Sequence, residues 1–577
     1  MAEVDSPAEA ASKKALAEVY ACLESGQSFR LEAGAGAGKT YSLVKALRFL
    51  VEKHSISMSR RSQRIACITY TNVAKDEIAS RTDRSPLILC ETNHAFCWSL
   101  IGGFQRQLRE LIPQISPWQE RIEEAGGLGE RRVEYNLGHR YIRDDLISLH
   151  HDDVLPLTIK LMEHVKFRRL IADRYPIILI DEYQDTDADW VDAIKAHFLG
   201  QTGAPLFGFF GDHWQKIYGN GCGKLEHPAV KEIGKEANFR SVRAIVDSLN
   251  RMRPELPQFV EDINAPGQVQ IFHSNNWSGI RQTGPHWGGD LPSEVSHDAL
   301  VRTQALLSEG GWTFSPEGTK ILMLTHRVLA AEQGYSSLPG VFRYSDAFTA
   351  KEHSYIEYLV DVLEPACDAY EARKFGAMFE AIGSQFPLIR TASDKTAWAR
   401  AMSELVALRA RGTVGDVLDH LKSARRPRLP ESIDEKEREL RAFIPSETEP
   451  MPDALVEIEK LRAVPYSEIK ALRAYHSGFS PFETKHGVKG AEFENVLVVV
   501  GRGWNRYNFG EMLELAGRGT IPAAKQDAFE RNRNLFYVAC SRPKRRLALL
   551  FTQQLTPAAI STLGRWFGQE TVQPLAF

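Results

Sequence analysis

The stretch from residue 31 to residue 44, LEAGAGAGKTYSLV, constrains the fold of this 577-residue chain more than any other feature. Glycines alternate with alanines before a Gly-Lys-Thr triplet, and glycine suits a backbone that turns tightly or closely approaches a ligand. A strand-like apolar run precedes the loop, and residues 41–52 carry apolar side chains with the 3.6-residue period of a helix. A Gly/Ala-rich turn with a chance Gly-Lys-Thr is the alternative. Strand, loop and helix nevertheless follow in the order that a phosphate-binding loop requires.

In such a loop, backbone N–H groups and the N-terminal end of the following helix bind the phosphates of a nucleotide. We expect Lys39 to reach the β- and γ-phosphates and the Thr40 hydroxyl to bind Mg²⁺. The usual pattern starts with a glycine where this chain has Ala33. The predicted nucleotide-binding residues of the loop are Ala33, Gly34, Ala35, Gly36, Ala37, Gly38, Lys39 and Thr40.

A second motif, IILIDEYQDTD over residues 177–187, places two carboxylates at the end of a strand-like run. The carboxyl ends of parallel strands are where ligands bind in open α/β sheets. We expect Asp181 to hold Mg²⁺ through water and Glu182 to position or deprotonate the attacking water. Acidic residues at strand ends are common. This pair indicates a metal-assisted phosphoryl site because a phosphate loop precedes it in the same chain.

A third motif, FFGDHWQKIYGN, also follows a strand-like run. We expect Asp212 and Gln215 to lie beside the γ-phosphate, with the Gln215 amide sensing its presence. Trp214 and Tyr218 flank these residues. For Trp214, a place in the hydrophobic core and a place in the site are both left open.

Composition excludes several classes of protein. The net charge of −3 gives no global sign of nucleic-acid binding, so a surface of that kind must be local. Basic clusters occur at residues 60–64, 166–169, 425–428 and 544–546, and each by itself is typical of a solvated face. The seven cysteines form no C-x-x-C pair, which argues against zinc and against a disulfide framework. No apolar run reaches membrane-spanning length, so we expect a cytoplasmic protein.

Strand-like runs followed by helical patterns recur along the chain, which predicts an α/β fold with parallel sheets. Two stretches rich in Leu, Ala, Arg and Glu interrupt this alternation, one from residue 93 to about 167 and one from 351 to about 469. We expect both to be mostly helical insertions.

The order of these and further motifs resembles that of the UvrD/Rep-like helicases of superfamily 1, from about residue 28 to residue 552. The phosphate loop AGAGAGKT is followed by ITYTNVAKDEIASR, TNHAFCWSL, LIDEYQDTD, GDHWQKIYG, ANFRS, TKHGVKGAEFENV and RNLFYVACSR. The resemblance implies two RecA-like motor domains with ATP between them. It assigns residues 1–92 and 168–236 to domain 1A, 93–167 to insertion 1B, 237–350 and 470–577 to domain 2A, and 351–469 to a reduced insertion 2B.

The resemblance also implies roles for single residues. Arg240 and Arg542 match the arginines that stabilise charge on the γ-phosphate, which a guanidinium fork suits well. Phe239 matches the position that stacks on adenine. Glu492 matches the residue that binds the ribose, with Gly490 allowing close approach of the backbone.

For DNA, the resemblance points to a channel in which aromatic faces stack on bases and polar groups contact the backbone. Tyr70 matches a base-stacking position. The other positions that match the channel are Thr92, His94, Tyr218 and His486. A histidine such as His94 can equally be a satisfied structural residue.

The chain departs from the family at several points. The region before the phosphate loop, SKKALAEVYA, lacks the glutamine of the adenine motif, and Asn220 stands where the family has a stacking Trp. Pro543 follows Arg542 and limits the next turn.

These features predict an ATP- and Mg²⁺-dependent helicase or translocase that moves 3′→5′ on single-stranded or tailed duplex DNA, in repair or anti-phage defence. The alternative is a DNA-sensing ATPase switch that regulates a partner nuclease. The segment WNRYNF, 504–509, resembles one in UvrD-like helicases encoded beside OLD-family nucleases in Gabija-type defence systems. Its Trp504, Tyr507 and Phe509 are equally consistent with core positions.

Overall fold

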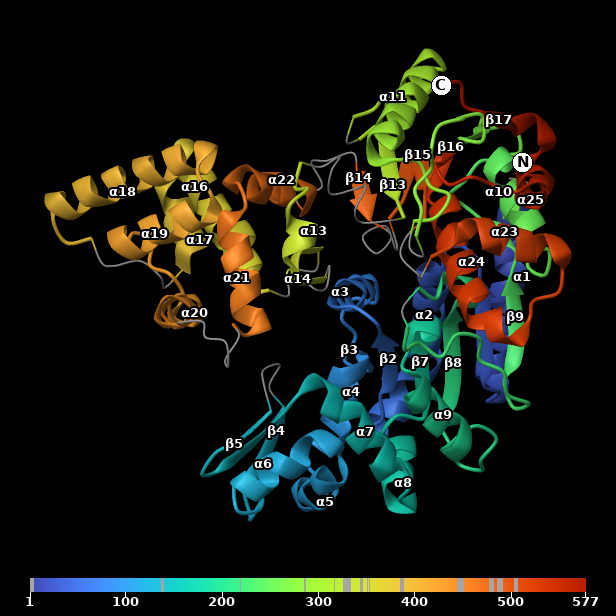
Figure 1. Cartoon of the computed structure of the whole chain (residues 1–577). Coiled ribbons are helices and arrows are strands. Elements are labelled where there is room, and N and C mark those ends of the chain that lie inside the picture. Colours follow the sequence, from blue (N-terminus) through green and yellow to red (C-terminus); the bar gives the residue numbers. More distant parts are fainter. Residues whose placement is uncertain are drawn as a thin grey trace. The chain divides into compact units, whose positions relative to one another are not determined.

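The computed structural model describes most of the chain and divides it into two compact units. The first consists of residues 1–269, 511–547 and 557–571, and the second of residues 270–510, 548–556 and 572–577. The described residues are 5–135, 140–217, 219–284, 287–315, 317–324, 334–342, 346–349, 351, 353–383, 389–443, 451–476, 482–484, 491–502 and 507–577. Figure 1 shows the elements of both units.

The first unit is built on a six-stranded sheet in the order β3-β2-β7-β8-β1-β9. Every neighbouring pair in it is parallel, as the alternation of strands and helices predicts. The strands are β1 Phe29–Ala33, β2 Ile65–Thr69, β3 Ile88–Thr92, β7 Ile177–Asp181, β8 Leu206–Gly211 and β9 Lys231–Lys235. Four of these were predicted from their apolar runs, whereas β3 and β9 were not. In β9 only Ile233 is apolar, so it lacks the signal of a buried strand.

Both faces of this sheet are covered, which explains the unbroken apolar runs of its central strands. Along β7, Ile178 and Ile180 enter one hydrophobic cluster, whereas Ile177 and Leu179 enter another. This alternation follows from the two-residue period of a strand. The helices of this α/β layer are α1 Pro7–Ser25, α2 Lys39–Arg60, α3 Asn72–Arg81, α9 Ala188–His197 and α10 Arg243–Met252.

The segment predicted as the first helical insertion is mostly helical, and it also contains a small sheet that the sequence did not predict. Its strands have the order β4-β6-β5 and are only two to four residues long, too short for a periodic signal. Trp118, Val133 and Ile147 form part of its core. The elements are α4 Asn93–Ile101, α5 Gln105–Leu111, α6 Gln119–Glu124, β4 Arg132–Tyr135, β5 Tyr141–Ile142, β6 Leu146–Leu149, α7 His151–Met162 and α8 Val165–Arg174.

The second unit contains most of the other six-stranded sheet, in the order β14-β13-β15-β16-β12-β17. Strand β13 pairs in parallel with both β14 and β15, and β12 pairs in parallel with β17. The strands are β12 Gln268–His273, β13 Thr319–Met323, β14 Phe482–Thr484, β15 Phe493–Val500, β16 Pro543–Phe551 and β17 Val572–Pro574. The α/β class with two parallel-strand sheets is therefore confirmed.

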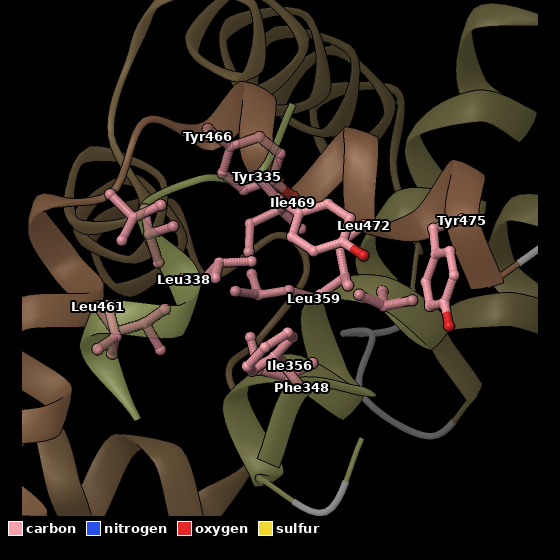
Figure 2. Close-up of a cluster of buried hydrophobic side chains, with 14 of the residues drawn as sticks. Tyr335, Leu338, Phe348, Ile356, Leu359, Leu461, Tyr466, Ile469, Leu472 and Tyr475 are labelled. Atoms are coloured by element: carbon pink, nitrogen blue, oxygen red, sulfur yellow. The ribbon is translucent and has the colours of Figure 1, made fainter. Parts of the chain in front are cut away.

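Within the second unit, the described residues from 353 to 476 are mostly helical, as predicted for the second insertion. A cluster of buried aromatic and aliphatic side chains joins α13 and α14 to these helices (Figure 2). Arg409 binds both carboxylate oxygens of Glu364, at 2.6 and 2.7 Å, inside this region. The helices are α13 Leu338–Val341, α14 Asp346–Thr349, α15 Ser354–Glu357, α16 Glu364–Glu371, α17 Phe375–Ile382, α18 Ala392–Arg411, α19 Val414–Ala424, α20 Glu431–Ala442, α21 Asp453–Ala463 and α22 Tyr466–His476.

Three further helices belong to the C-terminal part of the chain: α23 Phe509–Arg518, α24 Gln526–Cys540 and α25 Pro557–Phe567. Helix α11, Ser293–Glu309, belongs to the second unit. Among the described residues, no helix combines the length and apolar character needed to cross a bilayer.

Candidate nucleotide site and nucleic-acid interface

The glycine-rich loop joins the carboxyl end of β1 to the first residue of α2, as the sequence predicts. Gly36 and Gly38 have φ angles of +74° and +69°, a conformation that only glycine adopts without strain. A Cβ on Gly36 would lie 2.8 Å from both the Arg240 Cβ and the Asn238 Oδ1. The glycines therefore allow close approach of the backbone, and the loop opens into the N-terminus of a long helix. This geometry fits a bound polyphosphate.

Lys39 is the first residue of α2, and its side chain is 11% exposed. Its Nζ lies 2.6 Å from Oε2 of Glu182. Burial by itself lowers the pKa of Lys39, but the carboxylates of Glu182 and Asp181 outweigh it, and the net shift is upward. Lys39 is therefore a fixed cation beside the loop, ready to bind an anion.

Glu182 follows the last residue of β7 and has a φ of +49°, which is uncommon for a residue with a side chain. Its Oε2 accepts a hydrogen bond from Nε2 of Gln184 at 2.6 Å in addition to the Lys39 ion pair. Asp181, the last residue of β7, is 4% exposed. A carboxylate here and the Thr40 hydroxyl on α2 supply the oxygen ligands that Mg²⁺ prefers. The donor set fits the predicted metal.

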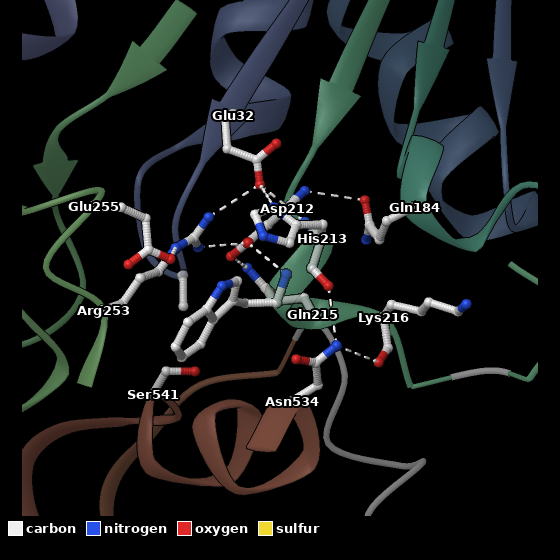
Figure 3. A network of polar contacts seen from close by, with 12 residues as sticks. Glu32, Gln184, Asp212, His213, Gln215, Lys216, Arg253, Glu255, Asn534 and Ser541 are labelled. Carbon is white, nitrogen blue, oxygen red and sulfur yellow. Dashed lines mark hydrogen bonds and ion pairs between the residues drawn. The ribbon is translucent and has the colours of Figure 1, made fainter. Parts of the chain in front are cut away.

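The third motif forms a relay of hydrogen bonds after β8. Nε2 of Gln215 donates to Oδ2 of Asp212 at 2.7 Å, and Nη2 of Arg542 donates to Oε1 of Gln215 at 3.2 Å. Gln215 therefore has both its donor and its acceptor end engaged. Figure 3 shows the surroundings of Asp212 and Gln215.

The two arginines predicted to face the γ-phosphate lie in the same compact unit as the phosphate loop. Nη1 of Arg240 donates to the Ser541 carbonyl at 3.1 Å, beside Arg542 in the chain. Burial, and then the neighbouring guanidinium of Arg240, lower the pKa of Arg542 to about 9. Two guanidinium groups held this close to each other favour an anion between or beside them.

Sequence reasoning missed the buried ionic network behind this relay. Arg253 donates to Oδ1 of Asp212 at 2.6 Å and to Oε1 of Glu32 at 3.0 Å. Glu32 also accepts from Tyr183 at 2.6 Å and contacts Nδ1 of His213 at 2.6 Å. Burial raises the pKa of Glu32, but His213 and Arg253 outweigh it and hold the carboxyl well below its usual range. The sequence feature that could have indicated this network is Glu32, a charged residue inside the buried strand FRLEA.

The ligand atoms of Glu32, Asp212 and His213 lie close enough together to hold a metal ion. Arg253, however, binds both carboxylates, so a guanidinium already supplies the compensating positive charge. The cluster is better explained as an ion network that fixes Asp212 behind Gln215.

A second set of residues that the sequence did not predict donates hydrogen bonds to backbone carbonyls of the phosphate loop. Asn238 and Gln258 donate to the Ala35 carbonyl at 3.0 and 3.2 Å. Nζ of Lys235 donates to the Gly38 carbonyl at 3.1 Å and to the Ser42 hydroxyl at 2.8 Å. Burial lowers the pKa of Lys235 to about 8. These donors engage the Ala35 and Gly38 carbonyls of the loop.

Phe239, predicted to stack on adenine, is 38% exposed. It lies beside the loop, because its N–H donates to the Gly36 carbonyl at 2.9 Å. Tyr41 on α2 is also exposed, and the Lys235 Nζ lies 5.8 and 6.0 Å from the ring centres of Phe239 and Tyr41. Glu492 is an exposed residue of the second unit, and Gly490 lies outside the described residues.

The predicted DNA-binding residues have different environments. Tyr70 follows β2 and is 44% exposed. Thr92 ends β3 at the start of α4. His94 stacks on His151 with ring centres 3.5 Å apart, and burial together with His151 lowers its pKa to about 4. Tyr218 and His486 lie outside the described residues.

The sequence was consistent with Trp214 either in the hydrophobic core or in the site, and the structure shows it 6% exposed. Its ring meets Tyr537 edge-on at 5.3 Å, and the Arg533 guanidinium lies 4.0 Å from the ring centre. Trp214 is therefore a core residue that joins the third motif to α24. In the second unit, Tyr507 and Phe509 are buried and stack on each other, which favours the core interpretation for both. Trp504 lies outside the described residues.

Comparison with known proteins agrees with this geometry. The model of an AAA domain matches residues 20–220, which include the phosphate loop and the four motifs that follow it. The Gabija protein GajB of Bacillus cereus (strain HuB5-5) is 22% identical over 94% of this chain and 96% of its own length. The chain is similar in sequence to helicases of the UvrD/Rep type.

Two helicases support that relationship over part of the chain. The ATP-dependent DNA helicase PcrA of Staphylococcus aureus (strain Mu50 / ATCC 700699) is 22% identical over 38% of this chain and 37% of its own length. The ATP-dependent DNA helicase Rep of Escherichia coli (strain K12) is 22% identical over 42% of this chain and 44% of its own length. The similarity to UvrD/Rep-like helicases supports an ATPase of the helicase type.

Proposed function

We propose that this chain hydrolyses ATP in order to move 3′→5′ on single-stranded DNA. The observation that carries the proposal is the convergence of Lys39, Glu182 and the Gln215–Arg542 pair around one glycine-rich loop. The domain plan inferred from the sequence, with motor domains 1A and 2A and insertions 1B and 2B, is part of the proposal. So is a cytoplasmic location, where such an enzyme meets DNA.

In the proposed reaction, a water molecule attacks the γ-phosphorus of ATP and the bond to the β–γ bridging oxygen breaks. Glu182 accepts the proton of the water, and ADP leaves with the electron pair of the broken bond. Lys39, Arg240 and Arg542 stabilise the negative charge that spreads over the phosphoryl oxygens. Thr40 and Asp181 would hold Mg²⁺, which would supply positive charge to the phosphates.

The Lys39–Glu182 ion pair gives the site two alternative arrangements. With the pair formed, the Glu182 carboxylate is engaged by Lys39 and Gln184. When Lys39 binds a phosphate instead, Glu182 loses that partner and becomes the stronger base. The γ-phosphate itself therefore releases the general base, which couples hydrolysis to correct binding.

The proposed DNA contacts are stacking of bases on Tyr70 and polar contacts from Thr92 and His94. His94 is neutral at physiological pH because its pKa is lowered to about 4. It therefore contributes a hydrogen bond or a ring face, and no charge. Tyr218 and His486, which lie outside the described residues, are proposed as further DNA contacts.

A second candidate function is a DNA-sensing ATPase switch that regulates an OLD-family nuclease partner. Its support is the extent of similarity: the match to the Gabija protein GajB covers 94% of this chain, whereas the match to PcrA covers 38%. The same comparison supports a role in anti-phage defence.

One experiment separates the two candidates. ATPase activity and strand displacement are measured on matched duplexes that carry a 3′ or a 5′ single-stranded tail. A 3′→5′ motor displaces the strand of the 3′-tailed duplex and leaves the 5′-tailed duplex intact. The switch is favoured if DNA stimulates the ATPase activity but neither duplex is displaced, and if a nuclease encoded by an adjacent gene co-purifies with the protein. ATPase activity that ignores DNA contradicts both.

A further inference from the structure

Two basic clusters that lie about one hundred residues apart in the sequence meet in the first unit. Together they line a surface hollow of about 450 Å³, which we call the basic basin. Arg61 comes from the C-terminal end of α2, and the rest of the lining comes mainly from α8. Its charged and apolar lining residues are Arg61, Lys166, Arg169, Leu170, Asp173 and Arg174.

The basin has an excess of positive charge. All four of its cations, Arg61, Lys166, Arg169 and Arg174, are exposed. Within the part of the chain that the structure describes, none of the four forms an ion pair with a carboxylate. The basin therefore offers its charge to a partner outside the chain.

The basin lies at the edge of the sheet opposite to the phosphate loop. Arg61 precedes β2 and Arg174 precedes β7, and the two segments are joined by a hydrogen bond from the Arg64 N–H to the Arg174 carbonyl at 2.9 Å. Helix α8 lies beyond the N-terminal end of β7 (Figure 1). Glu182 follows the carboxyl end of that five-residue strand, about 16 Å away at 3.3 Å per residue. Changes in the basin therefore leave the chemistry of the loop untouched.

We propose that the basic basin binds the phosphodiester backbone of duplex DNA at a point separate from the single-strand channel. This inference rests on the proposed function, since it concerns the DNA on which the motor acts. Guanidinium forks match phosphate oxygens and need no base contact. A protein partner fits less well, because the cores of protein interfaces are poor in charge and contain aromatic anchors, whereas four cations and no aromatic side chain line this hollow.

The test uses the full-length protein and measures its affinity for a 3′-tailed duplex at several salt concentrations. The quadruple variant R61Q/K166Q/R169Q/R174Q removes the four charges. Each phosphate contact to B-DNA contributes about −0.9 to the slope of log K against log salt. We expect the slope of the variant to be smaller in magnitude by about 2 to 4. Affinity for a short single strand and ATPase activity without DNA stay at wild-type values.

The matched control removes four lysines elsewhere in the same unit, in the variant K13Q/K14Q/K53Q/K231Q. Its slope stays at the wild-type value if the basin is a local contact. An unchanged slope in the basin variant, or an equal drop in the control, overturns the basin while the motor function stands. Failure of the wild type to bind any DNA overturns both. If the quadruple variant does not fold, R169Q alone is expected to change the slope by about 0.9.

Discussion

Arg542 donates a hydrogen bond from Nη2 to Oε1 of Gln215 at 3.2 Å, while the other end of the Gln215 amide donates to Asp212 at 2.7 Å. The residues that pair are 327 positions apart in the chain. A ligand that attracts Arg542 must therefore also move or release the Gln215 amide. Arg542 lies two residues after the end of α24. This hydrogen bond therefore connects the proposed γ-phosphate sensor, Gln215, to α24.

Lys39→Ala is expected to lower ATP turnover at least about 100-fold, because a fixed cation beside the γ-phosphate is lost. Single-strand DNA binding is expected to stay within a few-fold of wild type. Steady-state ATPase assays and fluorescence anisotropy check the two parts. Near-normal turnover in this variant would refute the assignment of the phosphate loop.

Arg542→Ala is expected to lower kcat by about 1,000-fold or more. This is the lower end of the effect of an arginine finger on phosphoryl transfer. KM for ATP is expected to change much less. Arg542→Lys keeps the charge but loses the fork, and we expect it to recover only part of the loss. A variant that weakens ATP binding while keeping kcat contradicts this role.

Lys235 provides a prediction about pH. Its pKa is lowered by burial from 10.5 to about 8, so between these values the unfolded chain binds more protons than the folded one. Stability contributed by this group therefore rises with pH across that window. Between pH 8 and pH 9.5, wild type is expected to gain about 1.5 kcal/mol relative to Lys235→Met.

The measurement is urea unfolding of both proteins at the two pH values. Tyr41, Phe239, Ser42 and the Gly38 carbonyl face the Lys235 ammonium, and burial is the sole cause of its shift. The tyrosine and all distant groups are common to both proteins and cancel in the difference. A stability difference that is independent of pH contradicts a buried charged lysine.

Arg253→Met is expected to destabilise the first unit by about 3 to 5 kcal/mol, because Glu32 and Asp212 lose their buried cation. Arg251→Met, two residues earlier on α10, removes an exposed arginine and is expected to cost less than about 1 kcal/mol. Chemical denaturation of both variants checks the contrast. Equal, small losses in the two variants mean that the network is not needed for stability.

Much of the fold followed from the sequence. The strands that carry the site, such as β1 and β7, are fully buried, and a strand covered on both faces needs an unbroken apolar run that is easy to recognise. Strand β9 was not predicted because Ile233 is its one apolar residue, and the strands of the small sheet β4-β6-β5 are too short to give a periodic signal. The helical second insertion was recognised from its composition.

The sequence by itself determined the phosphate loop, the acidic strand end and the order of the motifs, because each is a local pattern that a few neighbouring residues specify. Only the tertiary structure decided which distant groups meet: Arg253 with Glu32 and Asp212, Lys235 with the Gly38 carbonyl, and Arg61 with the basic face of α8. These contacts depend on the order of strands in the sheet, which is set by packing over the whole unit. No local pattern encodes them.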